Sequence, residues 1–182
     1  INKGYDSLIN DKVLFHKYFT NNSLVVKSFA YIINKKLIDA YTGEMIEDEE
    51  KFLSSHKEDI IIKQSRGGGG RDVTLIKFDD FQTNKALNRF KDIISSNQDY
   101  VIQYRVVQDG LSSIIAPNSL NTIRVLVGKN KNNKPFIITA VQRFGTKKSK
   151  SVDNWSSGGI SVAIDINTGI FGKGVIYPYN DK

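Results

Sequence analysis

Apolar residues recur at two different spacings along the chain. In residues 6–19 and 83–95 they fall three and four positions apart, which predicts two amphipathic helices. The acidic segment 47–50 fits the start of a short helix between them, because a helix N-terminus carries partial positive charge. After residue 100 apolar positions alternate or form short runs, and this pattern predicts strands.

Short β-rich segments bounded by turn residues make up most of the remaining chain. The turn signals are Thr42-Gly43, KNKNN and DINTG. Together with the helices, the strands indicate an α+β fold dominated by antiparallel pairs. The expected strands are 25–33, two within 36–46 on either side of Thr42-Gly43, 59–63, 72–78, 100–106, 121–127, 135–144, 159–165 and 169–175.

Net charge, cysteine content and the length of apolar runs exclude some kinds of site but do not identify a binding partner. The net charge is +7, from 26 basic and 19 acidic residues, which favours anionic partners or simply keeps the protein in solution. The chain has no cysteine, which excludes disulfides, thiolate metal sites and cysteine nucleophiles and fits a reducing cytoplasm. No apolar run approaches the roughly 18 residues of a membrane span. We therefore expect a cytoplasmic protein with no membrane partner.

The segment IIIKQSRGGGGRDVTLI carries the clearest chemical signal. Lys63 ends an apolar strand, and a run of four glycines follows, flanked by Arg66 and Arg71. Glycines let backbone N–H groups approach phosphate oxygens closely. No GK[ST] is present and a strand follows the loop, so the segment is neither a P-loop nor a dinucleotide fingerprint. The alternative is a flexible turn between two strands.

Two later segments add arginines and a polar loop. In NTIRVLV, alternation places Arg124 on the opposite sheet face from its apolar neighbours, and Arg143 ends the following strand. Guanidinium groups on a sheet face suit phosphate or carboxylate binding, although surface salt bridges would give the same pattern. In VDNWSSGGISVAID, Asn154 and Trp155 precede Gly158-Gly159. The glycines permit close approach to a ligand, and the indole either stacks or anchors the loop.

Five motifs in this order resemble the ATP-grasp superfamily, and most closely its sugar-transfer-associated family. They are NDKVLFHKYF, IIIKQSRGGGGRDV, YVIQYRV, NSLNTIRVLV and VDNWSSGGISVAIDINTG, and they run from about residue 10 to the end. The resemblance implies two α+β subdomains with mainly antiparallel sheets that grip a nucleotide. We divide the chain into 1–58, an abbreviated N-terminal lobe, 59–99, a glycine-loop hairpin with a helix, and 100–182, an antiparallel sheet incomplete at its C-terminus.

The resemblance also implies roles for particular residues. Lys63 would contact the adenine edge and the α-phosphate, and the glycine loop would close over the phosphates. Residues 103–106 would form a hinge that bonds the adenine through its backbone. Superfamily members often carry Glu at or beside position 103, where this chain has Gln. The implied nucleotide-binding residues are Lys63, Arg66, Gly67, Gly68, Gly69, Gly70, Gln103, Tyr104, Arg105 and Val106, and the implied catalytic residues are Arg124, Arg143 and Asn154.

The implied activity is ATP-dependent, Mg²⁺-dependent ligation through an acyl phosphate, in the context of polysaccharide biosynthesis. The partners would be ATP and a carboxylate-bearing small molecule or sugar-linked acceptor. The acidic residue and Glu-x-Asn motif that bind magnesium in this superfamily are expected beyond residue 182, so we expect this chain alone to be inactive. The alternatives are a non-catalytic nucleotide-binding module and, with less support, a basic nucleic-acid-binding domain.

Overall fold

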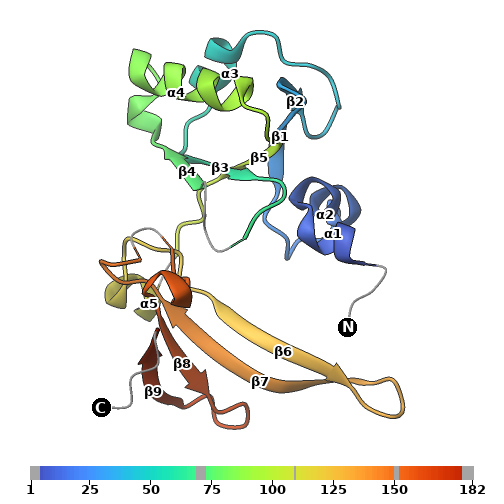
Figure 1. The fold of residues 1–182 in the computed structure, drawn as a ribbon, viewed down its shortest axis with the longest axis vertical. Helices are drawn as coiled ribbons and strands as arrows, with labels where there is room; N and C mark the ends of the chain where they lie inside the picture. The colour runs from blue at the N-terminus through green and yellow to red at the C-terminus, as the bar shows by residue number, and fades with distance from the viewer. Residues whose placement is uncertain (1–4, 69–72, 109, 150–151, 178–182) are drawn as a thin grey trace. The chain divides into compact units, whose positions relative to one another are not determined.

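The computed structural model describes residues 5–68, 73–108, 110–149 and 152–177. The chain divides into two compact units, residues 1–105 and 106–182, and each contains one antiparallel sheet (Figure 1). The sheet of the first unit takes strands from all three expected segments, 1–58, 59–99 and, through residues 100–104, also 100–182. The α+β class with antiparallel sheets is confirmed.

The first unit is a five-stranded sheet in the order β2-β1-β5-β3-β4, with helices packed against it. The central position of β5 places the end of the unit's chain in the middle of the sheet. In chain order the elements are α1 Asp6–Asn10, α2 Lys12–Phe19, β1 Ser28–Ile33, β2 Lys36–Asp39, α3 Glu49–Ser55, β3 Ile60–Gln64, β4 Val73–Ile76, η1 Phe78–Asp80, α4 Asn84–Ser95 and β5 Tyr100–Tyr104.

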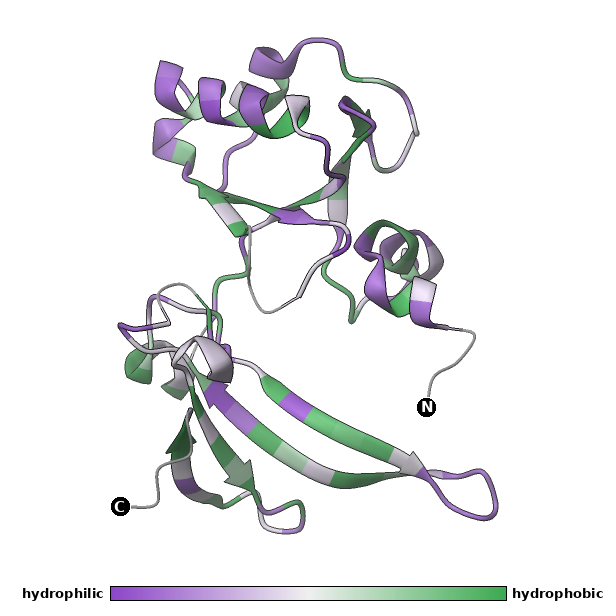
Figure 2. Ribbon diagram, viewed as in Figure 1, coloured by the Kyte–Doolittle hydropathy of each residue, from purple (hydrophilic) through white to green (hydrophobic). Residues whose placement is uncertain are grey.

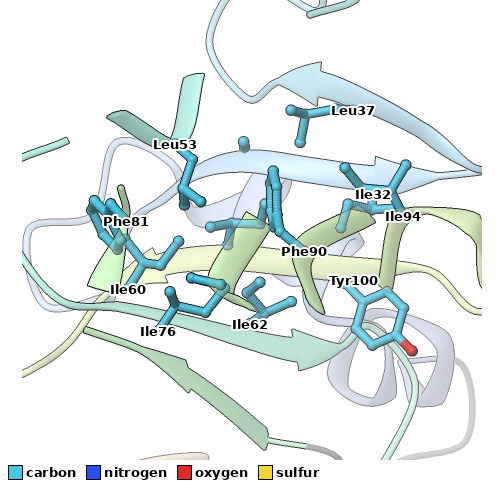
Figure 3. Packing of buried hydrophobic residues seen from close by; sticks show 13 residues of the cluster. Ile32, Leu37, Leu53, Ile60, Ile62, Ile76, Phe81, Phe90, Ile94 and Tyr100 are labelled. Atoms are coloured by element: carbon cyan, nitrogen blue, oxygen red, sulfur yellow. The ribbon is translucent and has the colours of Figure 1, made fainter. Parts of the chain in front are cut away.

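Helices α3 and α4 cover one face of this sheet and build the main core (Figure 3). Alternation along the strands turns Ile60 and Ile62 of β3 toward Phe90 of α4, and all three are fully buried. Helix α4 buries residues at intervals of four, as its sequence period predicts. Thr83 begins it by accepting a hydrogen bond from the Ala86 backbone.

Helix α2 packs on the opposite face of the same sheet. Val13 contacts Tyr31 of β1 and Val101 of β5 in a second, smaller cluster. His16 is also buried here, and its Nδ1 lies 2.5 Å from the Tyr31 hydroxyl. Burial raises the pKa of Tyr31 to about 12 and lowers the pKa of His16, so this contact joins two neutral groups at pH 7. The face with α2 is also the face that carries Lys63.

The single helix expected over residues 6–19 is interrupted. Asp11 has extended backbone, separates α1 from α2 and forms an isolated bridge with Arg66. Its carboxylate accepts from the backbone N–H groups of Val13 and Leu14, which begins α2 as an N-cap. The apolar spacing did not reveal the break, because a capping Asp occupies one position without disturbing the period on either side.

The hairpin between β1 and β2 turns at Asn34-Lys35, where both residues have positive φ (50° and 62°). This turn was not anticipated, since the pair lacks glycine. The expected turn at Thr42-Gly43 is present, with φ of 76° at Gly43. The strand expected after it is reduced to a single bridge between Ile38 and Met45.

The second unit is a four-stranded sheet in the order β6-β7-β8-β9. Figure 2 shows long hydrophobic stretches along β6 and β7 and a hydrophilic turn at the tip of their hairpin. Several of these apolar side chains, including Val125 and Phe136, are exposed. The elements are α5 Leu111–Ile115, β6 Ile123–Lys129, β7 Pro135–Phe144, η2 Trp155–Ser157, β8 Ile160–Ile164 and β9 Phe171–Ile176.

A polar network replaces a large core where α5 meets the start of β6. The Gln108 amide donates to the carbonyls of Ser112, Ala116 and Ser119, and accepts from Asn121. The Asn121 side chain in turn accepts from the backbone N–H of Gly145. The helix α5 was not anticipated from sequence. None of the helices in the described part of the chain combines the length and apolar character needed to span a bilayer.

Candidate functional site

Lys63 lies on the α2 face of the first sheet, one position from the end of β3. Its register neighbours are Val101 on β5 and Val73 on β4. Because Ile60 and Ile62 point into the main core, alternation turns Lys63 to the opposite side. Its side chain is half-buried there, and burial, followed by the nearby charge of Lys12, lowers its pKa.

The Lys63 ammonium donates to Gln103 Oε1 at 3.1 Å. Gln103 lies on the neighbouring strand β5, and its Nε2 donates to Val26 O and Ser28 Oγ, each at 3.1 Å. Among the described residues, no carboxylate is within ion-pair distance of Lys63. The lysine therefore holds a fixed position while its positive charge stays uncompensated by the described chain.

Lys12 is a second cation at this site, and the sequence analysis did not assign it a role. Its ammonium donates to Ser65 O at 3.3 Å and to Gly67 O at 2.9 Å, so α2 is tied to the start of the glycine loop. Burial lowers the pKa of Lys12, and the neighbouring Asp11 partly offsets this. The signal available in the sequence was the order Asp-Lys at a helix start, within the motif NDKVLFHKYF.

The beginning of the glycine loop is held by Asp11. Its Oδ1 accepts from Ser65 Oγ at 2.6 Å and its Oδ2 from Arg66 Nε at 3.0 Å. The Arg66 side chain is largely exposed beyond this contact. Gly67 and Gly68 are described, and a side chain at Gly68 would meet no neighbouring atom within 4 Å. Gly69, Gly70 and Arg71 lie outside the described residues.

The expected hinge follows at the end of β5. The Tyr104 ring packs 4.4 Å from the Phe29 ring, centroid to centroid. Arg105 pairs with Asp59 at 3.0 Å and also donates its backbone N–H to Asp59 O. Val106 is partly exposed and begins the second unit. The implied adenine contact by this segment stays a prediction.

In the second unit, Arg143 is buried against Asp153. Its NH2 lies 2.5 Å from Asp153 Oδ1, and its Nε donates to Asp153 O at 3.2 Å. The other carboxylate oxygen accepts from the backbone N–H of Thr122 at 2.9 Å and from the Thr122 hydroxyl. Arg143 thus has a carboxylate partner that joins β7 to the loop before β8, and its implied contact with phosphate stays a prediction.

Arg124 is exposed on β6, where it pairs with Val141 of β7, and its separation from the apolar face of the strand stays a prediction. A bulge between Leu126 and Val127 then shifts the pattern. Asn154 begins η2 and donates through Nδ2 to the hydroxyls of Ser156 and Ser157. The structure describes Arg124 and Asn154 within the second unit, and their catalytic roles remain predictions.

The loop around Trp155 is held by the protein itself. The indole N–H donates to Val175 O on β9 at 3.2 Å, which supports the anchoring interpretation. A Cβ at Gly159 would lie only 2.4 Å from Asp153 O. The close approach that this glycine permits is therefore to the chain's own backbone, where the sequence analysis expected a ligand.

A family model described as sugar-transfer associated ATP-grasp matches residues 2–178. The match covers nearly the whole chain and includes both the Lys63 face and the β6–β9 sheet. The chain belongs to the sugar-transfer-associated ATP-grasp family. In a comparison with curated protein sequences, nothing matched. The resemblance drawn from the five motifs is thus confirmed.

Family membership assigns both units of the chain to the same kind of domain. Both sheets belong to an ATP-grasp domain associated with sugar transfer, because the family match spans residues of both units. It does not assign individual contacts. Within this ATP-grasp domain the first unit brings together Lys12, Lys63 and Gln103, and the second unit brings together Thr122, Arg143 and Asp153.

Proposed function

We propose that the Lys63 face of this ATP-grasp domain binds the phosphates of ATP. The observation that carries the proposal is the pair of lysine ammoniums gathered at the base of the glycine loop, with no carboxylate within ion-pair distance of Lys63 among the described residues. Two partly desolvated cations repel each other, and a polyphosphate relieves that repulsion while accepting hydrogen bonds from both. Backbone N–H groups of a glycine-rich segment add further donors.

We propose ATP-dependent ligation as the reaction of the whole protein. A carboxylate of the small-molecule or sugar-linked substrate attacks the γ-phosphorus, the bond to the β–γ bridging oxygen breaks, and ADP leaves with that electron pair. An amine or similar nucleophile then attacks the acyl carbon, phosphate leaves, and the nucleophile loses a proton. Most of the catalysis in phosphoryl transfer comes from positioning and charge stabilisation, which suits lysine and arginine side chains. Arg124, Arg143 and Asn154 are the proposed participants from the second unit.

Magnesium supports phosphoryl transfer by bridging phosphate oxygens. In the parts of the chain that the structure describes, no three acidic or histidine side chains come close enough together to hold a metal ion. These described residues do not fit a magnesium site, and the roles proposed for the lysine and arginine side chains do not depend on the metal.

Titration with ADP and a fluorescent ATP analogue tests the nucleotide site. Lys63→Ala removes a charged hydrogen-bond donor, and the loss should be about 1.5–3 kcal/mol of binding free energy, which is roughly tenfold or more in Kd. Lys85→Ala is the matched control, because it removes the same charge from the exposed side of α4, on the other face of the sheet. Equal affinities of wild type and Lys63→Ala would remove Lys63 from the site.

Turnover is tested separately from binding. Release of ADP in the presence of magnesium and a panel of amino acids or uronic acids would support ligation. Nucleotide binding by the whole protein without ADP release from any carboxylate would instead support a binding module.

A further inference from the structure

The Gln103 side chain contacts Lys63 through its amide oxygen, while both of its amide N–H groups bind other residues of the first unit. Its two amide N–H groups donate to Val26 O and Ser28 Oγ, and its oxygen accepts from Lys63 Nζ. The orientation of the amide follows from its partners, because a lysine ammonium can only donate and a backbone carbonyl can only accept. Ser28 is fully buried, so one end of this chain of contacts is anchored within the sheet.

We propose that Gln103 is a positioning residue for Lys63, which fixes the ammonium for a phosphate while leaving its charge uncompensated. This rests on the proposed function, in which Lys63 binds nucleotide. Both N–H groups of Gln103 already have partners, so the residue acts on a ligand through Lys63. A glutamate could accept the same hydrogen bond, but its negative charge would pair with the ammonium and compete with phosphate.

The charges that face Lys63 come from few elements. Helix α2 contributes Lys12, and the adjacent Asp11 is engaged with Ser65 and Arg66. Strand β5 contributes the neutral Gln103, and the described residues of β4, Val73–Ile76, contain no titratable side chain. A neutral acceptor in this setting leaves the site net positive. The pKa of Lys63 therefore stays lowered, because no described carboxylate lies at ion-pair distance to stabilise the protonated amine.

This arrangement sets the direction of the pH dependence. Phosphate binding needs the protonated amine, so affinity should fall as pH rises through the lowered pKa of Lys63. A carboxylate at position 103 would stabilise the protonated amine and raise that pKa. The alkaline fall in affinity would then move to higher pH, even though affinity near neutral pH becomes weaker.

The experiment compares wild type, Gln103→Glu and Gln103→Met in the full chain. Gln82→Glu is the matched control, because Gln82 is exposed beside Phe81 at the α4 side of the sheet and gains the same charge. The Lys63 amine is titrated by nitrogen and carbon NMR without nucleotide, and the Kd for ADP is measured across pH. We expect Gln103→Glu to raise the Lys63 pKa and to weaken ADP binding roughly tenfold near neutral pH.

Gln103→Met keeps the side-chain length but removes the acceptor and both donors. We expect weaker ADP binding without a rise in the Lys63 pKa, and no change in either quantity for Gln82→Glu. The proposal is overturned if the Lys63 pKa is the same in all four proteins, or if Gln103→Glu binds ADP as wild type does.

The NMR titration needs no nucleotide, so it tests the contact between Gln103 and Lys63 even if wild type fails to bind ADP. Failure of wild type to bind ADP would overturn the proposed function instead. If Gln103→Glu does not fold, the Kd of Gln103→Met for ADP is the test. A Kd equal to that of wild type would overturn the proposal.

Discussion

Individual charged residues in this ATP-grasp domain fall into two kinds of environment. Within the described part of the chain, Lys12 and Lys63 donate to neutral oxygens and to no carboxylate, so their charges remain available to an anion. Arg143 instead shares a buried site with Asp153, where both partners are less than one-tenth exposed. Removing one partner of a buried ion pair is destabilising, because the other charge is left buried without a counter-charge.

Asp153→Asn should therefore destabilise the second unit by about 3–5 kcal/mol, since it leaves Arg143 buried without a counter-charge. The matched control is Asp165→Asn in the same unit. Asp165 is exposed, and its Oδ1 accepts from the Asn167 and Thr168 backbones, a contact that the asparagine oxygen preserves. Denaturant unfolding followed by the fluorescence of Trp155, the sole tryptophan, measures both. Similar midpoints for the two variants would show that the Arg143–Asp153 pair contributes little to stability.

At the scale of elements, one short helix connects the core to the proposed phosphate site. Helix α2 packs on the sheet through Val13 and begins at Asp11, and Asp11 also binds the first residues of the glycine loop. Burial alone would raise the pKa of Asp11, but hydrogen bonds from Ser65, Leu14, Arg66 and Val13 outweigh it and lower the pKa. The carboxylate is thus stabilised in the folded chain.

Asp11→Ala should cost more stability than Asp48→Ala, although both remove a helix N-cap. In the described structure the Asp48 side chain accepts from Lys51 N at the start of α3, and losing such a cap costs about 1 kcal/mol. Asp11 in addition binds Ser65 and Arg66, contacts that add to the loss.

The difference between these two variants should also depend on pH. Because the folded-state pKa of Asp11 is depressed, its contribution is present above about pH 4, the unfolded-state value, and is lost as pH falls through the lower folded-state value. Chemical denaturation at pH 7 and near pH 3 measures this. Equal losses for the two variants at pH 7 would show that α2 is held by its cap and apolar contacts alone.

At the scale of the whole chain, the two units differ in how their sheets are stabilised. The first unit has a core of 13 buried residues between its sheet and the helices α3 and α4. Among its described residues, the second has a buried cluster of three, Ala116, Phe144 and Val162, supplemented by the polar network around Gln108. Strand β6 is exposed along nearly its whole length.

Native-state hydrogen exchange should reflect this difference. We expect the amides of β1, β3 and β5 to exchange slowest, because opening them exposes the main core. The amides of β6 should exchange faster, since few buried apolar contacts oppose their opening. Exchange is followed by mass spectrometry or NMR in the intact chain. Protection of β6 equal to that of β5 would contradict this account.

Local patterns in the sequence determined much of the fold. The period of residues 83–95 predicted α4, and the apolar pattern of NTIRVLV predicted the strand β6, because each depends only on the geometry of one element. The motif order predicted the family, and the glycine run after Lys63 identified the site that we propose for phosphate. These inferences needed no contact between distant residues.

Only the tertiary structure decided which residues act together. Lys12 and Lys63 are 51 positions apart in the sequence. They come close because α2 packs on the face of the sheet that lies opposite the main core, and Lys63 of β3 is on that face. The break at Asp11 likewise follows from its bridge to Arg66, and the pairing of Arg143 depends on where the loop carrying Asp153 returns to β7. Gln103 looked like a hinge residue in the sequence. Its contact with Lys63 arises because β5 lies beside β3 in the sheet, and strand order is set by packing between elements, which no local period records.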